Sequence, residues 1–171
     1  PSFNNGYQGI ARGGAVGDVD NDAVQDIIVA DFSNGQLFQG HVYSIDKDCN
    51  QNWNNTLGTF GSQQPPALAD IDDDGKLEII VNTPLGVRVF NGEDGSLKWI
   101  SPELFSIYTD PVVADIDNDN AFEILVGLTW YNNTDENRLL IFDKNGSLDW
   151  YKQVDYPILS TPAVANMDND S

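Results

Sequence analysis

The sequence is short of cysteine, histidine and basic residues, and each shortage excludes a class of site or partner. The single cysteine, Cys49, rules out an intrachain disulfide. The single histidine, His41, excludes His-rich transition-metal sites and any mechanism that needs two histidines. Eight Lys and Arg residues against 27 Asp and Glu residues give a formal net charge of −19. We therefore expect no nucleic-acid partner, because the phosphate backbone requires a basic protein surface.

Long apolar runs are also absent. No stretch approaches the ~18 apolar residues that a membrane-spanning helix needs, so we expect no direct membrane insertion. The chain has 171 residues, 40% of them hydrophobic, which is enough for one domain with a sizeable core. We treat residues 1–171 as a single domain.

What the sequence does contain is a dense acidic stretch, PALADIDDDGKLE at residues 66–78. Asp70, Asp72, Asp74 and Glu78 occupy positions 1, 3, 5 and 9 of the loop that begins at Asp70, with Gly75 at position 6. Carboxylates on alternate residues of a tight loop converge on one point and repel each other. A hard divalent cation that takes about six to eight oxygen ligands removes this repulsion. The stretch therefore predicts a Ca²⁺ site.

The same spacing recurs along the chain. It appears in GDVDNDAVQD and ADIDNDNAFE, and a last copy, NMDNDS, ends inside the motif. The residues at the corresponding positions of these copies are Asp18, Asp20, Asp22 and Asp26; Asp115, Asp117, Asp119 and Glu123; and Asn166, Asp168 and Asp170. We therefore predict three Ca²⁺ sites and a partial fourth. The loops begin about 45–52 residues apart, a period that indicates a propeller, a solenoid or an array.

The segments between the loops read as short strands. Each repeat opens with an apolar segment (13–19, 66–71, 111–116 and 162–167), and after the loop comes a run that looks buried on both faces (26–32, 77–83 and 122–129). A third strand (41–46, 86–91 and 138–143) and a tryptophan-bearing fourth strand follow, joined by turns rich in Asp, Asn and Gly. Since no helical period occurs, we predict an all-β fold of β-propeller blades, each with four antiparallel strands. The repeats are about 13–60, 61–105, 106–156 and a truncated 157–171, which makes about three and a third blades.

These features together resemble the FG-GAP/VCBS repeat of integrin-α-like calcium-binding β-propellers. The resemblance rests on the DxDxDGxxE loop between two strands, the PAVADID-type opening and the FDxxGSLxW ending. It implies side-chain ligands at loop positions 1, 3, 5 and 9 and a backbone carbonyl ligand at position 7, which is Val24, Lys76 or Ala121 here. Ala23 and Asn120 depart from the glycine at position 6. If this position needs a positive φ, alanine resists it, and we expect a distorted or weaker first site.

An EF-hand is the main alternative for a DxDxDG string. It needs a bidentate glutamate at position 12 and flanking helices. Position 12 is Val29, Val81 or Val126, and the flanking segments look like strands. We therefore reject this alternative.

The predicted blades do not complete a propeller, since propellers have about four to eight blades. We expect the chain to be part of a larger propeller, or other copies of the chain to supply the missing blades. An exposed strand edge on an open array would favour such pairing.

Contact with a ligand is expected where the repeats diverge. Trp130 and Tyr131 lie in a long polar connection that the second repeat lacks, and insertions of this kind map to one face of a repeat array. We name them, with the connection from Phe32 to Phe38, as the expected ligand contacts. N-glycosylation sequons occur at Asn54, Asn132, Asn145 and Asn169.

These features predict a calcium-binding extracellular or cell-surface module for adhesion, recognition or scaffolding, with a protein, a glycan or further copies as partner. No catalytic residue is predicted, because every close carboxylate pair belongs to a metal loop and no Cys–His nucleophile can be assembled. Two alternatives stay open. One is the propeller part of a carbohydrate-active enzyme or lectin, and the other is a structural subunit of a surface layer or filament.

Overall fold

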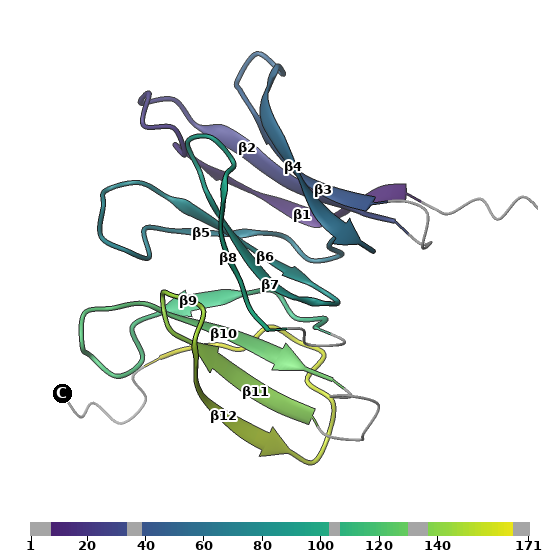
Figure 1. Ribbon diagram of the computed structural model, residues 1–171, viewed down its shortest axis with the longest axis vertical. Coiled ribbons are helices and arrows are strands. Elements are labelled where there is room, and N and C mark those ends of the chain that lie inside the picture. Colours follow the sequence, from purple (N-terminus) through teal and green to yellow (C-terminus); the bar gives the residue numbers. More distant parts are fainter. Residues whose placement is uncertain (1–7, 34–38, 103–106, 130–136, 166–171) are drawn as a thin grey trace, which may run out of the picture.

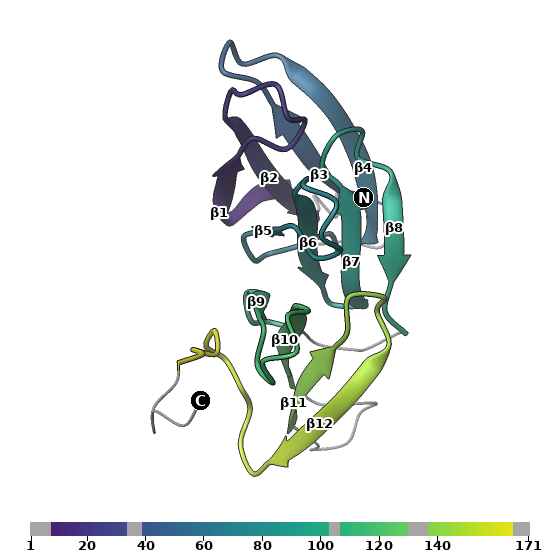
Figure 2. The same ribbon diagram turned by 90° about the vertical axis from the view of Figure 1, so that its left-hand side faces the viewer.

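The fold is a row of three antiparallel sheets, seen in a computed structural model that describes residues 8–33, 39–102, 107–129 and 137–165 (Figures 1 and 2). Each sheet has four strands, and their order in the sheet follows their order in the chain. The first blade comprises β1 (Gln8–Gly17), β2 (Asp26–Ser33), β3 (Gln39–Ile45) and β4 (Gln51–Thr59). The second comprises β5 (Ala67–Ala69), β6 (Glu78–Thr83), β7 (Gly86–Asn91) and β8 (Leu97–Ile100). The third comprises β9 (Val112–Ala114), β10 (Glu123–Leu128), β11 (Asn137–Phe142) and β12 (Leu148–Val154).

The all-β prediction and the prediction of partial propeller blades are confirmed. The described residues contain no helix, and the three sheets do not close into a ring. The fourth opening segment forms no strand over residues 162–165, and its remaining residues lie outside the described part of the chain. A first strand is stabilised by hydrogen bonds to the second strand of its own blade. No second strand that could pair with residues 162–165 lies in the described part of the chain.

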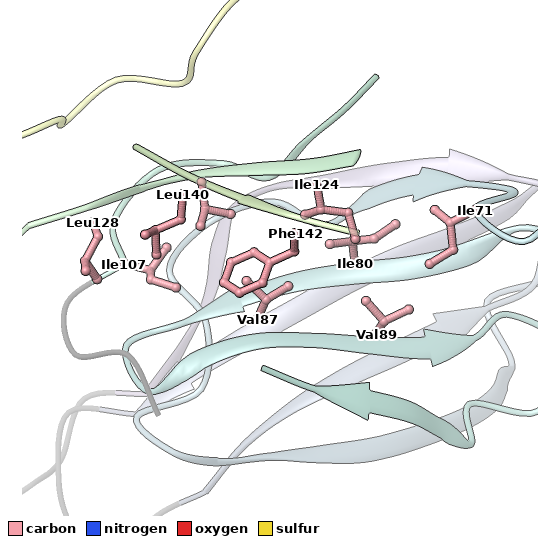
Figure 3. Packing of buried hydrophobic residues seen from close by; sticks show 10 residues of the cluster. Ile71, Ile80, Val87, Val89, Ile107, Ile124, Leu128, Leu140 and Phe142 are labelled. Atoms are coloured by element: carbon pink, nitrogen blue, oxygen red, sulfur yellow. The ribbon is translucent and has the colours of Figure 1, made fainter. Parts of the chain in front are cut away.

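The blades pack face to face, with the first strands together at one side. In Figure 2 the inner strands β1, β5 and β9 lie on the left and the outer strands β4, β8 and β12 on the right. Strand β5 contacts both β1 and β9. Two apolar clusters fill the spaces between the sheets, one between the first and second blades and one between the second and third. Figure 3 shows the second of these, with Phe142 of β11 beside Val87 of β7.

Burial of the second strands depends on what lies beside each blade. Every residue of β6 is buried, because β6 has a sheet on either side. Strand β2 belongs to an end blade, and although Ile28 is buried, Ile27 on its other face is 42% exposed. The expectation of two buried faces is therefore confirmed for residues 77–83 and wrong for residues 26–32.

Strand β10 also belongs to an end blade, yet all its residues are buried. The segment after β12 runs back across its outer face. A Cβ placed on Gly127 would lie 2.6 Å from the Ile158 side chain, and the Thr129 hydroxyl donates a hydrogen bond to the Ile158 carbonyl at 3.3 Å. The chain beyond β12 thus covers the face on which a next blade would stack.

A tryptophan on the fourth strand links each blade to the next. Trp53 Nε1 donates a hydrogen bond to the Gly92 carbonyl of the second blade at 2.9 Å. Trp99 Nε1 donates in the same way to the Lys144 carbonyl of the third blade at 2.8 Å. The two residues are therefore packing anchors between blades. Trp150, which holds the equivalent position in the third blade, is 45% exposed.

Candidate metal centres

The three complete acidic loops connect the first and second strands of their blades. Figure 1 shows them at the left-hand ends of the blades: the purple loop between β1 and β2, the teal loop between β5 and β6 and the green loop between β9 and β10. Since the blades are stacked in register, all three loops lie at the same edge of the array. The Asn21 side-chain amide donates to the Gly75 carbonyl at 3.3 Å, so the first and second loops are in contact.

The carboxylate at loop position 1 holds the turn together. In each loop it accepts hydrogen bonds from the backbone N–H groups of positions 5 and 6, at distances of 2.9–3.2 Å. The carboxylate at position 5 accepts one from the N–H of position 7, at 2.7–2.9 Å. The donors at position 7 are Val24, Lys76 and Ala121. Because the same bonds form in all three loops, the repeated sequence produces a repeated geometry.

Positions 4 and 6 of each loop adopt a left-handed backbone conformation. Position 6 has φ values of 67° at Ala23, 85° at Gly75 and 69° at Asn120. The condition stated from the sequence, a positive φ at position 6, therefore holds in all three loops. The first loop nevertheless closes its turn with the same hydrogen bonds as the others. Its clustered carboxylates differ, because Asp26 at position 9 is not among them, and a weaker first site stays a prediction. Because Ala23 has a positive φ without being a glycine, its backbone is strained by about 1–2 kcal/mol.

The carboxylate at position 9 comes from the start of the second strand and is buried. Asp26, Glu78 and Glu123 are 4%, 2% and 7% exposed. Each accepts a hydrogen bond from the backbone N–H of loop position 2, at 3.3, 3.0 and 2.9 Å respectively. Burial raises the pKa of all three carboxyl groups, and in Glu123 the neighbouring Asp117, Asp119 and Asp115 raise it further.

Three of the four predicted ligand carboxylates in each loop have oxygens that lie close enough for one ion. Three groups have carboxylate oxygens within 4.8 Å of one another: Asp18, Asp20 and Asp22; Asp70, Asp72 and Glu78; and Asp115, Asp117 and Glu123. Oxygens bound to one Ca²⁺ ion at 2.3–2.6 Å are at most about 5 Å apart. In addition, Asp72 Oδ1 is a buried oxygen with no hydrogen-bond partner in the described residues. The all-oxygen donor sets therefore fit Ca²⁺.

The second loop differs from the others because a lysine reaches into it. Lys98 Nζ lies 2.5 Å from Asp72 Oδ2 and 3.1 Å from Glu78 Oε1, two carboxylates of the clustered group. In the first loop an amide takes this place, and Asn52 Nδ2 donates to Asp26 Oδ1 at 2.9 Å. The sequence analysis did not single out Lys98 or Asn52. The available signal was that each directly precedes the tryptophan of its repeat.

The raised pKa of the position 9 carboxyl groups predicts a pH effect on the calcium-free protein. A pKa above the ordinary value of 4.5 means that folded Glu123 binds a proton more readily than the unfolded chain does. The stability that proton binding at Glu123 gives the folded protein is therefore complete when the pH lies below that ordinary pKa. It is lost as the pH rises through the pKa of the folded state. Because metal ligands must be deprotonated, added Ca²⁺ should instead stabilise the protein more as the pH rises.

Urea unfolding of the calcium-free protein between pH 4 and pH 8 measures this effect, with Glu123→Gln as the comparison. The glutamine is neutral throughout this range and keeps an oxygen that can accept from the Ile116 N–H. We expect the stability of the wild type relative to Glu123→Gln to fall as the pH rises. A relative stability that rises with pH in the absence of calcium would contradict the assignment.

Several sequence predictions fall outside the described residues. These are the partial fourth loop (Asn166, Asp168 and Asp170), the ligand candidates Trp130 and Tyr131, and the sequons at Asn132 and Asn169. Among the described sequons, Asn54 is exposed on β4 and Asn145 is exposed in the turn before β12. No helix of the described residues is long and apolar enough to cross a membrane.

A separate hollow of about 380 Å³ lies where the chain enters the first strands of successive blades. Its lining comes from Arg12 of β1, Gln64 before β5, Asp110 before β9 and Thr161 after the third blade. The Thr161 hydroxyl donates to Asp110 Oδ2 at 2.7 Å and ties two of these segments together. Sequence reasoning missed this hollow, because its lining residues are brought together only by the stacking of the blades.

Comparisons with known proteins agree with this architecture. Residues 70–126, which run from the second loop through the third loop into β10, match the FG-GAP-like repeat family. No curated protein matches the chain. Among solved structures, BamB from Moraxella catarrhalis is similar with a TM-score of 0.52, at 17% identity over 82% of this chain and 36% of that one. The biofilm matrix protein Bap1 of V. cholerae matches with a TM-score of 0.37, at 19% identity over 82% of this chain and 28% of that one. The chain thus spans well under half the length of these two proteins, and at these identities the likeness to BamB concerns the fold alone.

Proposed function

We propose that this chain is a calcium-binding, non-catalytic module of an extracellular or cell-surface protein. The proposal starts from its FG-GAP-like repeat sequence and its β-propeller-like blades. The observation that carries the proposal is a cluster of three carboxylate oxygens in each of the three loops, at positions 1, 3 and 5 in the first loop and at positions 1, 3 and 9 in the second and third. Bare turns between strands need no more than one or two acidic residues. Four in register in each loop give a repulsion that a bound cation removes.

The ions act on the architecture of the blades. In the second and third loops the clustered oxygens come from the loop and, through position 9, from the start of the second strand, so a bound ion fixes the connection between the two strands. The contact between Asn21 and Gly75 would transmit this rigidity from the first loop to the second. Three rigid loops at one edge form a preorganised surface, which favours recognition because less conformational entropy is lost on binding.

The proposed location follows from the calcium chemistry and the surface charge. Extracellular calcium-binding modules have weak sites, with Kd values on the order of 10⁻⁴–10⁻³ M. Exposed loops of the present kind suit that range, and a net charge of −19 keeps a protein soluble. Glycosylation of the exposed Asn54 and Asn145, and of Asn132 and Asn169, is part of the proposal.

The proposed partner is a protein, a glycan or a further copy of the chain. The hollow beside Arg12 and Asp110 has a volume suited to a small polar ligand such as a sugar, since ligand pockets are about 300–1,000 Å³. The connection with Trp130 and Tyr131 remains a second candidate for this contact. The identity of the bound partner distinguishes an adhesive role from the two alternatives, a lectin and a structural subunit.

Isothermal titration of the calcium-depleted protein tests the calcium assignment. We expect about three Ca²⁺ ions per chain, with Mg²⁺ binding more weakly because it is reluctant to shed its water. Glu123→Gln should remove one site, because it takes a charged ligand from the third loop. Asp155→Asn is the matched control, since it removes one negative charge from an exposed residue outside the loops. No binding heat at millimolar calcium would overturn the proposal.

A further inference from the structure

Every blade carries a β-bulge at the same place, one residue before the tryptophan of its fourth strand. In the first blade Trp53 pairs with Ser44 and Gln51 pairs with Ile45, so Asn52 is an extra residue. In the second blade Trp99 pairs with Val89 and Leu97 pairs with Phe90, which leaves Lys98 as the extra residue. The third blade repeats the pattern with Asp149. A bulge changes the direction of a side chain.

In two of the blades the bulge residue contacts the carboxylate at loop position 9. Asn52 donates an amide hydrogen bond to Asp26 at 2.9 Å. Lys98 forms ion pairs with Glu78 and with Asp72, which holds loop position 3. The bulge residue thus reaches from the fourth strand into the metal loop across the sheet. Its chemical type differs in each blade: amide, ammonium and carboxylate.

We propose that the bulge residue sets the cation affinity of its loop, and that Lys98 is a tethered cation that occupies the second site when calcium is low. The proposal rests on the assignment of the loops as calcium sites. It reverses the order of Ca²⁺ affinities among the loops that the sequence alone indicates. The second loop has the most complete motif, DIDDDGKLE, yet it is the loop that already holds a positive charge.

The geometry explains why calcium and Lys98 compete. The ammonium group lies between two of the three carboxylates whose oxygens are clustered, at 2.5 and 3.1 Å. A Ca²⁺ ion bound by the same oxygens would be repelled by the ammonium group at this distance. Calcium must therefore displace the lysine side chain, whereas the first loop presents only the neutral Asn52. We expect the affinity for Ca²⁺ to be lower at the second loop than at the first.

The experiment compares Lys98→Gln with Lys47→Gln. Both variants lose one positive charge, but Lys47 pairs with Asp48 on an exposed turn outside the metal loops. In competition with a chromophoric chelator, Lys98→Gln should bind Ca²⁺ at its weakest site about tenfold more tightly than the wild type, since site affinity depends on charge count. Lys47→Gln should match the wild type. Equal titration curves for the two variants would overturn the proposal.

A second variant introduces a lysine at the equivalent bulge position of the first blade. Its result does not depend on whether Lys98→Gln folds. Asn52→Lys places an ammonium group beside Asp26, and we expect one further site to weaken by about tenfold. An unchanged set of affinities in this variant would also overturn the proposal.

Calcium-free stability gives a readout that needs no bound metal. Without calcium, Lys98→Gln should unfold at a lower temperature than Lys47→Gln, because Glu78 and Asp72 lose their counter-charge. Failure of the proposed function would look different, with no calcium binding by the wild type or any variant. If the wild type binds three ions and Lys98→Gln changes nothing, only the tethered-cation proposal fails.

Discussion

Replacing Gly95 by alanine should destabilise the protein by about 2–5 kcal/mol, although the change adds a single methyl group. Gly95 has a φ of +69°, and a Cβ there would lie 2.4 Å from the Trp53 ring. The left-handed backbone costs alanine about 1–2 kcal/mol. Overpacking adds about 1–3 kcal/mol, because Trp53 cannot move without losing its 2.9 Å hydrogen bond to the Gly92 carbonyl. Urea unfolding in calcium-free buffer, followed by tryptophan fluorescence, measures the loss.

Gly75→Ala is the matched control for this prediction. Gly75 also has a positive φ, +85°, but a Cβ there would meet nothing within 4 Å. We expect it to lose only the backbone contribution of about 1–2 kcal/mol. In a Trp53→Ala background, the effect of Gly95→Ala should fall to the same value, because the steric conflict is gone. Equal losses for Gly75→Ala and Gly95→Ala in the wild type would show that the tryptophan does not anchor the blades.

Removal of calcium should lower the melting temperature of the protein by on the order of 10–30 °C. A ligand that binds only the native state stabilises it by RT ln(1 + [L]/Kd), which at 10 to 100 times Kd is about 1.4–2.7 kcal/mol for each site. Three independent sites therefore give about 4–8 kcal/mol. For a chain of this size, each kcal/mol shifts the melting temperature by about 2–4 °C.

Differential scanning calorimetry at 10 mM Ca²⁺ and after chelation measures this shift. Sodium chloride at matched ionic strength is the control, since screening alone also weakens the repulsion between carboxylates. Glu123→Gln should lose about a third of the calcium-dependent shift, and Asp155→Asn should keep all of it. A melting temperature that does not depend on calcium, at low ionic strength, would contradict the role of the ions.

The fold could be predicted well because its determinants are local and repeated. The loop acids and the apolar run after them recur in each repeat, so the strands and their order followed from the pattern. The glycine at position 6 of one copy raised the question of a positive φ, which the backbone of all three loops has. The exposure of Ile27 could not be predicted in this way, because the sequence of β2 resembles that of β6 and only the absence of a neighbouring sheet distinguishes them.

The site was predicted less completely, for a similar reason. The carboxylates that line each loop are close in sequence, whereas Lys98 lies 20 residues after Glu78 and reaches it through a bulge. A bulge is a matter of strand register, which no composition pattern reveals. The hollow that Arg12 and Thr161 line is assembled from residues of successive blades, so its existence depends on how the blades stack.

The most direct test of the calcium assignment is an anomalous difference map from crystals of this chain grown in calcium. We expect one peak in each of the three complete loops, with carboxylate oxygens at about 2.3–2.6 Å. In the second loop, Asp70, Asp72 and Glu78 should surround the ion, and Lys98 Nζ should have moved away from it. Well-ordered loops with no peak, and with Lys98 still between Asp72 and Glu78 at high calcium, would contradict the assignment.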